Sequence, residues 1–429
     1  MAKRCLIVSY YFPPAGGGGV QRIVKWIKYL SRKDWAFTVI TAPVEKEIIP
    51  QDSSLTSEAG SETKIIYAGS GKPVTQESVL KTALKLNISN YLKRWVSAFL
   101  FIPDSRKNWL PHLRSALASE LKQHKYDCIL FSIPPYSIAM EAAETAEKMD
   151  IPVILDLRDP WSANPYKIHP SKFHENKDRG LEFAAISKIP NIISAYQNTV
   201  SLYKKYINSF DDKNYIVIPN GYDEEDFDSL KAVKHDPAHF HIGFSGTFYS
   251  HLNNPAPLFK AAAALKKKNP EAGEKIRFHH IGRSMINLKK TARKFGIAEQ
   301  IIEQSWLPHR KALEYLSGMD ALTFILDDRC KNSGNTVGGK VYEYLRLQKP
   351  ILALVPDKGE AADLIKNTNS GSDISPSDTR GIAALLADWL EKSPNYEYKN
   401  IEQFERSRQA EALVLFLEDI CAGQNKTGV

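Results

Sequence analysis

Residues 4–30 read RCLIVSYYFPPAGGGGVQRIVKWIKYL, and this stretch decides the fold. Its first part, residues 4–11, is an apolar run suited to a buried strand, and the glycines Gly16–Gly19 follow it. The next apolar side chains recur at helical spacing: Val20, Ile23, Val24, Ile27 and Leu30. A buried strand, a glycine turn and an amphipathic helix in this order indicate an α/β fold built on a parallel sheet.

The same alternation continues along both halves of the chain. In the first half we expect strands at 37–41, 64–67, 128–132, 153–157, 191–194 and 215–218, with helices such as 112–124 and 137–149 between them. In the second half we expect strands at 239–244, 276–281, 300–304, 320–326 and 350–354, and helices at 255–268, 309–317, 338–347 and 379–391. The acid-rich stretch 222–238 between them predicts a linker, and a last helix near 403–421 could pack back on the first domain.

We therefore predict two facing Rossmann-like domains, residues 1–221 and 239–400, with parallel sheets and an interdomain cleft. Ligands of such sheets bind at the carboxyl ends of the strands.

Bulk composition narrows the class of protein. With 43% apolar and 25% charged residues, the chain is typical of a globular protein, and we expect no transmembrane helix and no signal peptide. The four cysteines, Cys5, Cys128, Cys330 and Cys421, lack metal-type spacing, which predicts a cytoplasmic protein without a metal or cofactor.

The net charge of +8 comes entirely from the first half. It suggests an anionic partner there, membrane phospholipid or nucleic acid, although a basic surface that only aids solubility explains it equally well.

Two motifs of the first half combine groups suited to an anion and a hydroxyl. Gly18 and Gly19 stand at the start of a helix, where backbone amides can approach a phosphate, although the dinucleotide-binding fingerprint is absent. DLRDPW places Arg158, Asp159 and Trp161 at the end of a strand. Asp159 could orient or deprotonate a hydroxyl, and Arg158 could hold a phosphate. The alternative is an Asp–Arg pair that only caps the strand.

Two strand ends of the second half carry similar signals. FSGT offers Gly246 and Thr247 to a phosphate, and IGRS places Arg283 at the same rim.

The segment NSGNTVGGKVYEYLRLQKPILAL, residues 332–354, is the most informative. Its loop runs into a helix, so the free amides of residues 336–339 and the helix dipole suit a diphosphate. Lys340 adds positive charge, and Glu343 could accept hydrogen bonds from ribose hydroxyls. Alternatively, Lys340 and Glu343 form an ordinary surface salt bridge.

These motifs occur together in an order that resembles a known family. In chain order, the motifs are YFPPAGGGGVQR, SIPPYS before DLRDPW, NTVS, IPNGYD, FSGT, and GGKVYEYL before KPILAL. Together they resemble the retaining glycosyltransferases of family 4, which have the GT-B fold. The resemblance implies a nucleotide-sugar donor and a metal-independent, front-side displacement. It places the donor beside Gly18, Gly19, Gly246, Thr247, Asn335, Thr336, Val337, Gly338, Gly339 and Glu343. Glu343 matches the second glutamate of the Glu-x7-Glu motif, the one expected at the ribose.

Two departures from the family pattern shape the expected site. Asn335 replaces the first glutamate of that motif, and the Arg and Lys that commonly follow the FSG glycine are missing. We hypothesise that Lys340 and Arg283 supply the missing charge. The expected catalytic residues are then Asp159, Lys340 and Arg283, with Arg158 and Trp161 on the acceptor side.

The expected function is transfer of a sugar to a glycan or lipid-linked acceptor. Residues 81–102 mix basic, aromatic and aliphatic side chains in a way that suits an anionic membrane surface, such as the inner face of the plasma membrane, or an ordinary packed helix. A non-catalytic nucleotide-sugar-binding partner protein and a nucleotide-sugar epimerase are the alternatives. No nucleic-acid recognition motif occurs, so nucleic acid is not an expected partner.

Overall fold

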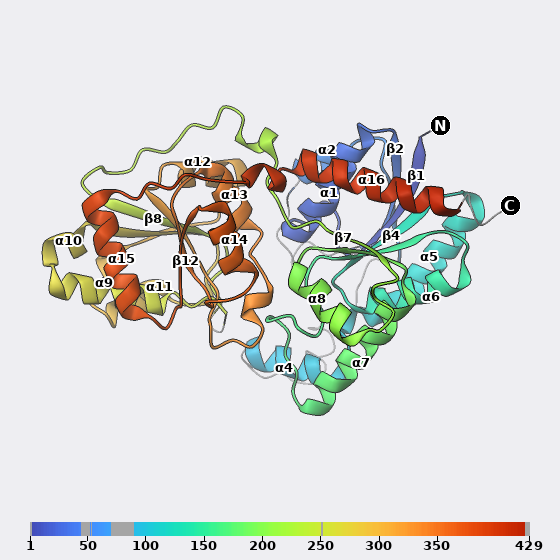
Figure 1. The fold of residues 1–429 in the computed structure, drawn as a ribbon, viewed down its shortest axis with the longest axis horizontal. Coiled ribbons are helices and arrows are strands. Elements are labelled where there is room, and N and C mark those ends of the chain that lie inside the picture. Colours follow the sequence, from blue (N-terminus) through green and yellow to red (C-terminus); the bar gives the residue numbers. More distant parts are fainter. Residues whose placement is uncertain (1, 44–51, 53, 70–89, 250–251, 425–429) are drawn as a thin grey trace. The chain divides into compact units, whose positions relative to one another are not determined.

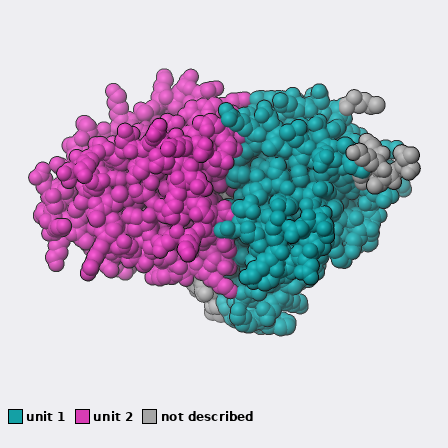
Figure 2. Space-filling model, viewed as in Figure 1, with its two compact units in different colours: residues 1–219, 406–429 teal, residues 220–405 magenta. Residues whose placement is uncertain are grey.

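A computed structural model describes residues 2–43, 52, 54–69, 90–249 and 252–424. The chain divides into two compact units, residues 1–219 with 406–429 and residues 220–405, which Figure 2 colours separately. The cleft expected between the domains stays a prediction.

Unit 1 contains a parallel sheet in the order β3-β2-β1-β4-β5-β6-β7 (Figure 1). Its strands are β1 (Lys3–Ser9), β2 (Trp35–Thr41), β3 (Lys64–Tyr67), β4 (Cys128–Ile133), β5 (Val153–Leu157), β6 (Asn191–Ser194) and β7 (Asn214–Val217). Its helices are α1 (Gly18–Ser31), α2 (Ser54–Glu58), α4 (Asn90–Leu100), α5 (Leu110–Gln123), α6 (Ser137–Lys148), α7 (Lys172–Lys188), α8 (Gln197–Tyr206) and α16 (Arg406–Gln424).

Alternate residues of each strand face opposite sides of this sheet, so the apolar runs build two cores. Leu6 and Val8 belong to the core that α5 and α6 cover, whereas Cys5 and Ile7 belong to the core that α1 covers. The carboxy-terminal helix α16 lies beside α1 (Figure 1) and adds four apolar side chains to that second core: Ala410, Leu413, Leu417 and Ile420. The last helix therefore returns to the first unit because it completes a buried face of the sheet.

Unit 2 contains a parallel sheet in the order β10-β9-β8-β11-β12-β13. Its strands are β8 (Phe240–Ser245), β9 (Ile276–Ile281), β10 (Ile301–Gln304), β11 (Ala321–Ile325), β12 (Ile351–Leu354) and β13 (Gly371–Ile374). Its helices are α9 (Ala256–Lys268), α10 (Pro270–Lys275), α11 (Leu288–Arg293), α12 (His309–Ser317), α13 (Lys340–Leu347), α14 (Glu360–Thr368) and α15 (Thr379–Lys392). Residues 222–238, the expected linker, belong to this unit, where the Val233 amide donates to the Glu314 carbonyl (3.0 Å).

Every strand expected from the sequence is present within two residues of its expected bounds. The strand β13 and the helices α2, α7, α8, α10, α11 and α14 were not expected. No described helix is both long and apolar enough to cross a bilayer. Of the proposed membrane-binding stretch 81–102, residues 81–89 lie outside the described residues.

Candidate active site

The motifs of unit 1 meet where the strand order reverses, between β1 and β4. The glycine loop follows β1, residues 134–136 follow β4, and DLRDPW ends β5, the neighbour of β4. Because adjacent loops diverge at such a reversal, this is the position where open parallel sheets bind ligands.

A buried ion pair holds these three strand ends together. Arg22, on the first turns of α1, lies 2.9 Å from Asp156 at the end of β5, and neither side chain is exposed. The Ser132 hydroxyl donates to the other oxygen of Asp156 (2.7 Å), and Arg22 also donates to the Ile218 carbonyl (2.8 Å). The sequence left open that DLRDPW only contributes an Asp–Arg pair that caps the strand. Such a pair exists at this strand end, and it is formed by Asp156 and Arg22.

Arg158 brings a second guanidinium against the glycine loop. It is buried and donates to the carbonyl oxygens of Ile133 (3.1 Å) and Pro134. A Cβ on Gly19 would lie 2.0 Å from Nη1 of Arg158, so only glycine allows this approach. The amides of Gly18 and Gly19 have no hydrogen-bond acceptor among the described residues. A guanidinium thus lies against Gly19 at the start of a helix, a combination that suits an anion.

Asp159 differs from its neighbours because its carboxylate has no hydrogen-bond or ion-pair partner within the described residues. Burial raises the pKa of Asp159, and the charges of Arg158 and Arg22 oppose that shift. A partly buried carboxylate with a raised pKa is suited to accept a proton.

Trp161, expected on the acceptor side, is fully buried in the same unit. Its indole Nε1 donates to Asp178 (2.9 Å), and its ring stacks on that of Tyr136, with the centroids 5.4 Å apart. This placement lets Trp161 support the site without direct contact to an acceptor.

In unit 2, the loops after β8 and β9 pair with each other. The Gly246 amide donates to the Ile281 carbonyl (2.9 Å), and Phe248 donates to Arg283 (3.2 Å). The amide of Gly246 is therefore already used, whereas that of Thr247 has no acceptor among the described residues. The side chain of Arg283 is exposed on the adjacent loop.

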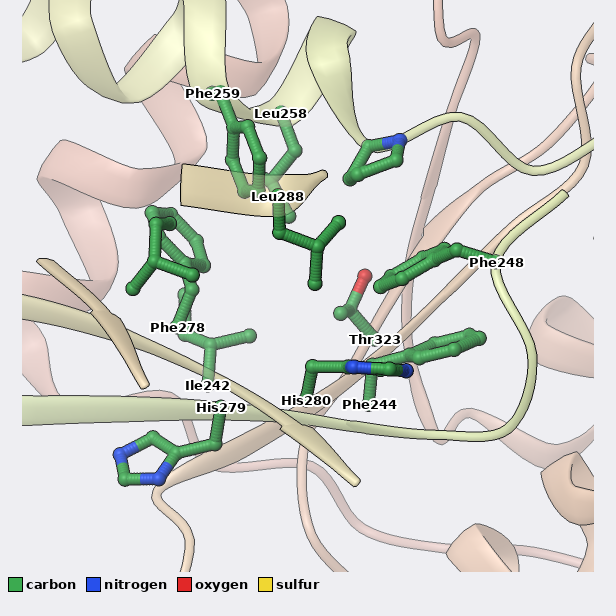
Figure 3. Close-up of a pocket in the computed structure, with 12 residues that line it drawn as sticks. Ile242, Phe244, Phe248, Leu258, Phe259, Phe278, His279, His280, Leu288 and Thr323 are labelled. Carbon is green, nitrogen blue, oxygen red and sulfur yellow. The ribbon is translucent and has the colours of Figure 1, made fainter. Parts of the chain in front are cut away.

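Aromatic side chains support this pair of loops from below (Figure 3). Phe244 and Phe248 stack with their ring centroids 4.0 Å apart, and His280 Nε2 donates to the Gly246 carbonyl (3.0 Å). The cavity beneath them is about 20 Å³ and lined mainly by apolar side chains, which is space for one water-sized molecule. It is too small for a nucleotide, so it is a packing void of the core.

The loop before α13 presents an open helix start. Asn335 ends a short 3-10 turn, Val337 is buried, and Gly338 and Gly339 are exposed with open space around them. The amides of these two glycines have no acceptor among the described residues. Thr336 is 3% exposed, and its hydroxyl has no hydrogen-bond partner in the part of the chain that the structure describes. Such an unpaired buried hydroxyl is costly in a folded protein unless a ligand satisfies it.

A charged cluster follows on the first turn of α13. Lys340 Nζ lies 3.3 Å from both oxygens of Glu343, and His309 Nε2 lies 3.0 Å from one of them. The Lys340 side chain is 39% exposed and that of Glu343 only 9%, so the predicted salt bridge exists but its acid is buried. Burial opposes the charged carboxylate, yet Lys340 and His309 outweigh it and lower the pKa of Glu343 to about 2. Burial likewise opposes the charge on His309, and Glu343 more than offsets it, so the pKa of His309 is raised.

Sequence reasoning missed three residues of this arrangement. Arg22 was quoted only as part of the glycine-loop motif, His309 only as the start of a helix, and Tyr344 only as a letter of the GGKVYEYL motif. The Tyr344 hydroxyl accepts a hydrogen bond from the Ser245 amide (2.8 Å), which fixes α13 to the end of β8. These partners lie far from the motifs in sequence, so spacing alone carries no signal for them.

Comparisons with known proteins agree with this architecture. No known protein family and no curated protein matches the sequence. A trehalose-6-phosphate phosphatase N-terminal domain from Candida albicans matches with a TM-score of 0.62 at 10% identity, over 100% of this chain and 98% of that one. A trehalose 6-phosphate synthase from Burkholderia multivorans matches with a TM-score of 0.61 at 11% identity, over 99% and 100%. WaaG, a glycosyltransferase involved in lipopolysaccharide biosynthesis, matches with a TM-score of 0.55 at 12% identity, over 97% and 98%.

The chain has the GT-B fold. This result confirms the predicted α/β class with two parallel sheets. At these identities the likeness concerns the fold, and membership of glycosyltransferase family 4 stays a prediction.

Proposed function

We propose that this protein is a glycosyltransferase that moves a sugar from a nucleoside-diphosphate sugar to a glycan or lipid-linked acceptor. The observation that carries the proposal is the start of α13. There, two exposed glycine amides, a buried hydroxyl without a partner and the ammonium of Lys340 gather within five residues. Diphosphate oxygens would satisfy the two glycine amides and the ammonium, and the helix dipole favours their negative charge.

The same groups suit the chemistry of the leaving group. Negative charge grows on the diphosphate as the sugar departs, and donors that are already in place stabilise that charge without rearrangement. In this proposal Lys340 and Arg283 provide the cations and no metal is needed. Glu343, oriented by His309, keeps carboxylate lone pairs for ribose hydroxyls.

Unit 1 offers the complementary groups for an acceptor. The guanidinium of Arg158 and the amides of Gly18 and Gly19 would hold an anionic group. Asp159, whose pKa burial raises, would take the proton of the attacking hydroxyl or orient it. A free carboxylate of this kind favours an enzyme over a non-catalytic nucleotide-sugar-binding protein. Retention of configuration follows from the family resemblance alone and belongs to the proposal.

An exposed apolar patch on unit 1 favours a lipid-linked acceptor. Phe99 (51% exposed) and Phe173 (67%) lie beside His174, whose ring centroid is 5.0 Å from that of Phe99 and 5.6 Å from that of Phe173, and Leu100 (56%) follows Phe99 in the chain. Lys177 lies over Phe173, 5.9 Å from the ring centroid. Apolar side chains beside a cation suit the interface of an anionic membrane. We include a peripheral position at the inner face of the plasma membrane in the proposal.

Nucleotide-sugar binding tests the proposal directly. We expect one of the UDP-, GDP-, ADP- or TDP-sugars to raise the melting temperature, because a ligand that binds only the folded state stabilises it. Lys340→Met should weaken binding of that nucleoside diphosphate by about tenfold or more, while binding of the free nucleoside stays the same. Lys311→Met is the matched control, since Lys311 also pairs with a glutamate three residues later on a helix, Glu314 at 2.6 Å.

The possible outcomes separate the hypotheses. Failure of all four donors to bind would refute the proposed function, and equal effects of the two lysine variants would remove Lys340 from the site. Binding without any sugar transfer or donor hydrolysis would indicate the non-catalytic alternative. An isomerised nucleotide sugar as the product would indicate the epimerase.

A further inference from the structure

Three histidines of unit 2 form a cluster away from the residues assigned to the donor. His241 lies on β8, His279 lies on the neighbouring β9, and His235 comes from the segment that precedes β8. One ring nitrogen of each lies within 4.8 Å of the others. His241 and His279 are buried, and His235 is half-buried at the edge of the cluster. Figure 3 shows the ring of His279 on the opposite side of the sheet from His280, which supports the Gly246 loop.

Hydrogen bonds to fixed acceptors orient two of these rings. His241 Nε2 lies 2.8 Å from the Asp236 carbonyl, and His235 Nε2 lies 3.3 Å from the Tyr315 carbonyl. A carbonyl only accepts, so both Nε2 atoms carry hydrogen and both Nδ1 atoms keep a free lone pair. An imidazole whose other nitrogen donates to a backbone carbonyl is the usual arrangement of a metal-binding histidine.

The third ring can adopt either tautomer. His279 Nε2 lies 2.8 Å from His241 Nδ1, the atom that carries the lone pair, and His279 Nδ1 lies 2.8 Å from the Tyr315 hydroxyl oxygen. Without a metal, Nε2 donates to His241 and Nδ1 accepts from the hydroxyl. If the proton moves to Nδ1 and the Tyr315 hydroxyl turns to accept, the lone pair of Nε2 is freed without loss of any proton.

The charges around the cluster permit a cation. Arg277 faces the cluster through His239 and is unfavourable. The Asp320 carboxylate, which accepts from the His241 amide (2.8 Å), and Asp236, paired with His239 (3.0 Å), offset that charge.

We propose that His235, His241 and His279 bind a Zn²⁺ ion, which fastens the segment before β8 to the sheet. Three neutral imidazoles with a water molecule in the fourth position match the tetrahedral coordination of zinc. Tetrahedral bonds of about 2.0–2.1 Å place ligand nitrogens about 3.3 Å apart, so the rings of His241 and His279 must separate slightly from their 2.8 Å contact.

The segment before β8, which contains Val233 and His235, already packs tightly against the end of α12. A Cβ on Gly318 would lie 1.8 Å from the Val233 carbonyl, and the Val233 amide donates to Glu314. The ion would therefore act on a segment that is in place and would stabilise unit 2 without taking part in sugar transfer.

Zinc titration of the untagged full-length protein, after treatment with a chelator, tests this inference. Calorimetry should show one Zn²⁺ bound per chain, and Co²⁺ should give the visible absorption of a tetrahedral site. Zn²⁺ should also raise the melting temperature by several degrees. His235→Ala should weaken zinc binding at least about tenfold, because a ligand of the ion is lost. This variant keeps both buried histidines, so it should fold.

A second variant and a control complete the design. His279→Gln, with its fold checked by circular dichroism, should lose binding as well. His124→Ala removes an exposed histidine of unit 1 and should bind zinc as the unmodified protein does. Absence of zinc binding, or variants of His235 and His279 that bind zinc as tightly as the unmodified protein does, would overturn the inference whether or not a nucleotide sugar binds.

Discussion

The buried carboxylate of Glu343 allows the sharpest test of the cluster on α13. Glu343→Gln keeps the size of the side chain and an oxygen for His309, and it removes only the charge. Lys340 and His309 both lie within 3.3 Å of the carboxylate, and both lose their anionic partner. The change therefore measures the electrostatic part of the cluster separately from its packing.

The size of the effect follows from the pKa of Glu343. The pKa falls from 4.5 to about 2, and each unit corresponds to about 1.4 kcal/mol between the two protonation states. The charged form thus contributes about 3 kcal/mol to the free energy of unfolding at neutral pH, and Glu343→Gln should lose most of it.

The sign of the pH dependence follows from the direction of the shift. Because the folded-state pKa is lowered, the contribution is present above pH 4.5 and is lost as the pH falls through about 2. The pKa of His309 is raised, so its pH dependence runs in the opposite direction. The contribution of protonated His309 to the free energy of unfolding is complete below about pH 6.5, the ordinary pKa of histidine, and is lost as the pH rises through the folded-state pKa. The difference between the unmodified protein and the variant should therefore be largest between these limits.

Urea denaturation at about pH 6 and about pH 2 measures this difference, and the unfolding transition of unit 2 should be the one that moves. Asp388→Asn is a suitable control because it removes an exposed ion pair of the same unit, Asp388–Lys392 at 3.0 Å. We expect the control to change stability by less than about 0.5 kcal/mol. If Glu343→Gln costs no more than the control at pH 6, or if its cost persists at pH 2, the proposed electrostatic role of Glu343 is wrong.

Three further predictions concern unit 1. Asp159→Asn should reduce turnover by a factor of about 10² to 10⁴, because the group that accepts the proton is lost. Its melting temperature should be unchanged or higher, because a carboxylate with a raised pKa lowers the stability of the folded protein once it is charged. In the unmodified protein, turnover should rise with pH through that pKa; a variant with normal turnover would exclude Asp159 from catalysis. Arg22→Met leaves the buried carboxylate of Asp156 without its cationic partner, and denaturation should show a loss of about 3–5 kcal/mol in unit 1; a loss below about 1 kcal/mol would contradict this. Phe99→Ser combined with Phe173→Ser should reduce sedimentation with anionic vesicles, whereas Met285→Ser, at an exposed site of unit 2, should not; equal sedimentation of both variants would argue against the patch.

The fold could be predicted well because its signals are local. A buried parallel strand such as Cys128–Ile133 is apolar along its whole length, and the turns that close it contain Pro or Gly. The missed strand Gly371–Ile374 reads GSDI and is half-buried at the sheet edge, so it lacks the apolar run that marks the central strands. The missed helix Lys172–Lys188 is polar over most of its surface, and periodicity gives little indication of it.

The candidate site could be predicted only for residues that stand in motifs. Gly19 and Arg158 come from two separate motifs, and the structure places the guanidinium of Arg158 against Gly19. Trp161 lies in the same motif, yet its ring is buried on Tyr136, which depends on a turn geometry that residue order does not reveal. His309 lies more than thirty residues before Glu343 and meets it only because α12 and α13 pack together.

The charge balance around α13 explains why the predicted salt bridge and the predicted phosphate site are compatible. A lone Lys340–Glu343 pair would be neutral and would attract a diphosphate weakly. The imidazole of His309 changes that balance, because Glu343 raises its pKa and so favours the protonated ring, whose positive charge Glu343 would share with Lys340. One carboxylate then faces two cations, and the excess charge lies beside the free amides of Gly338 and Gly339. The buried acid orients the cations without cancelling them, as a site that must hold a departing diphosphate requires.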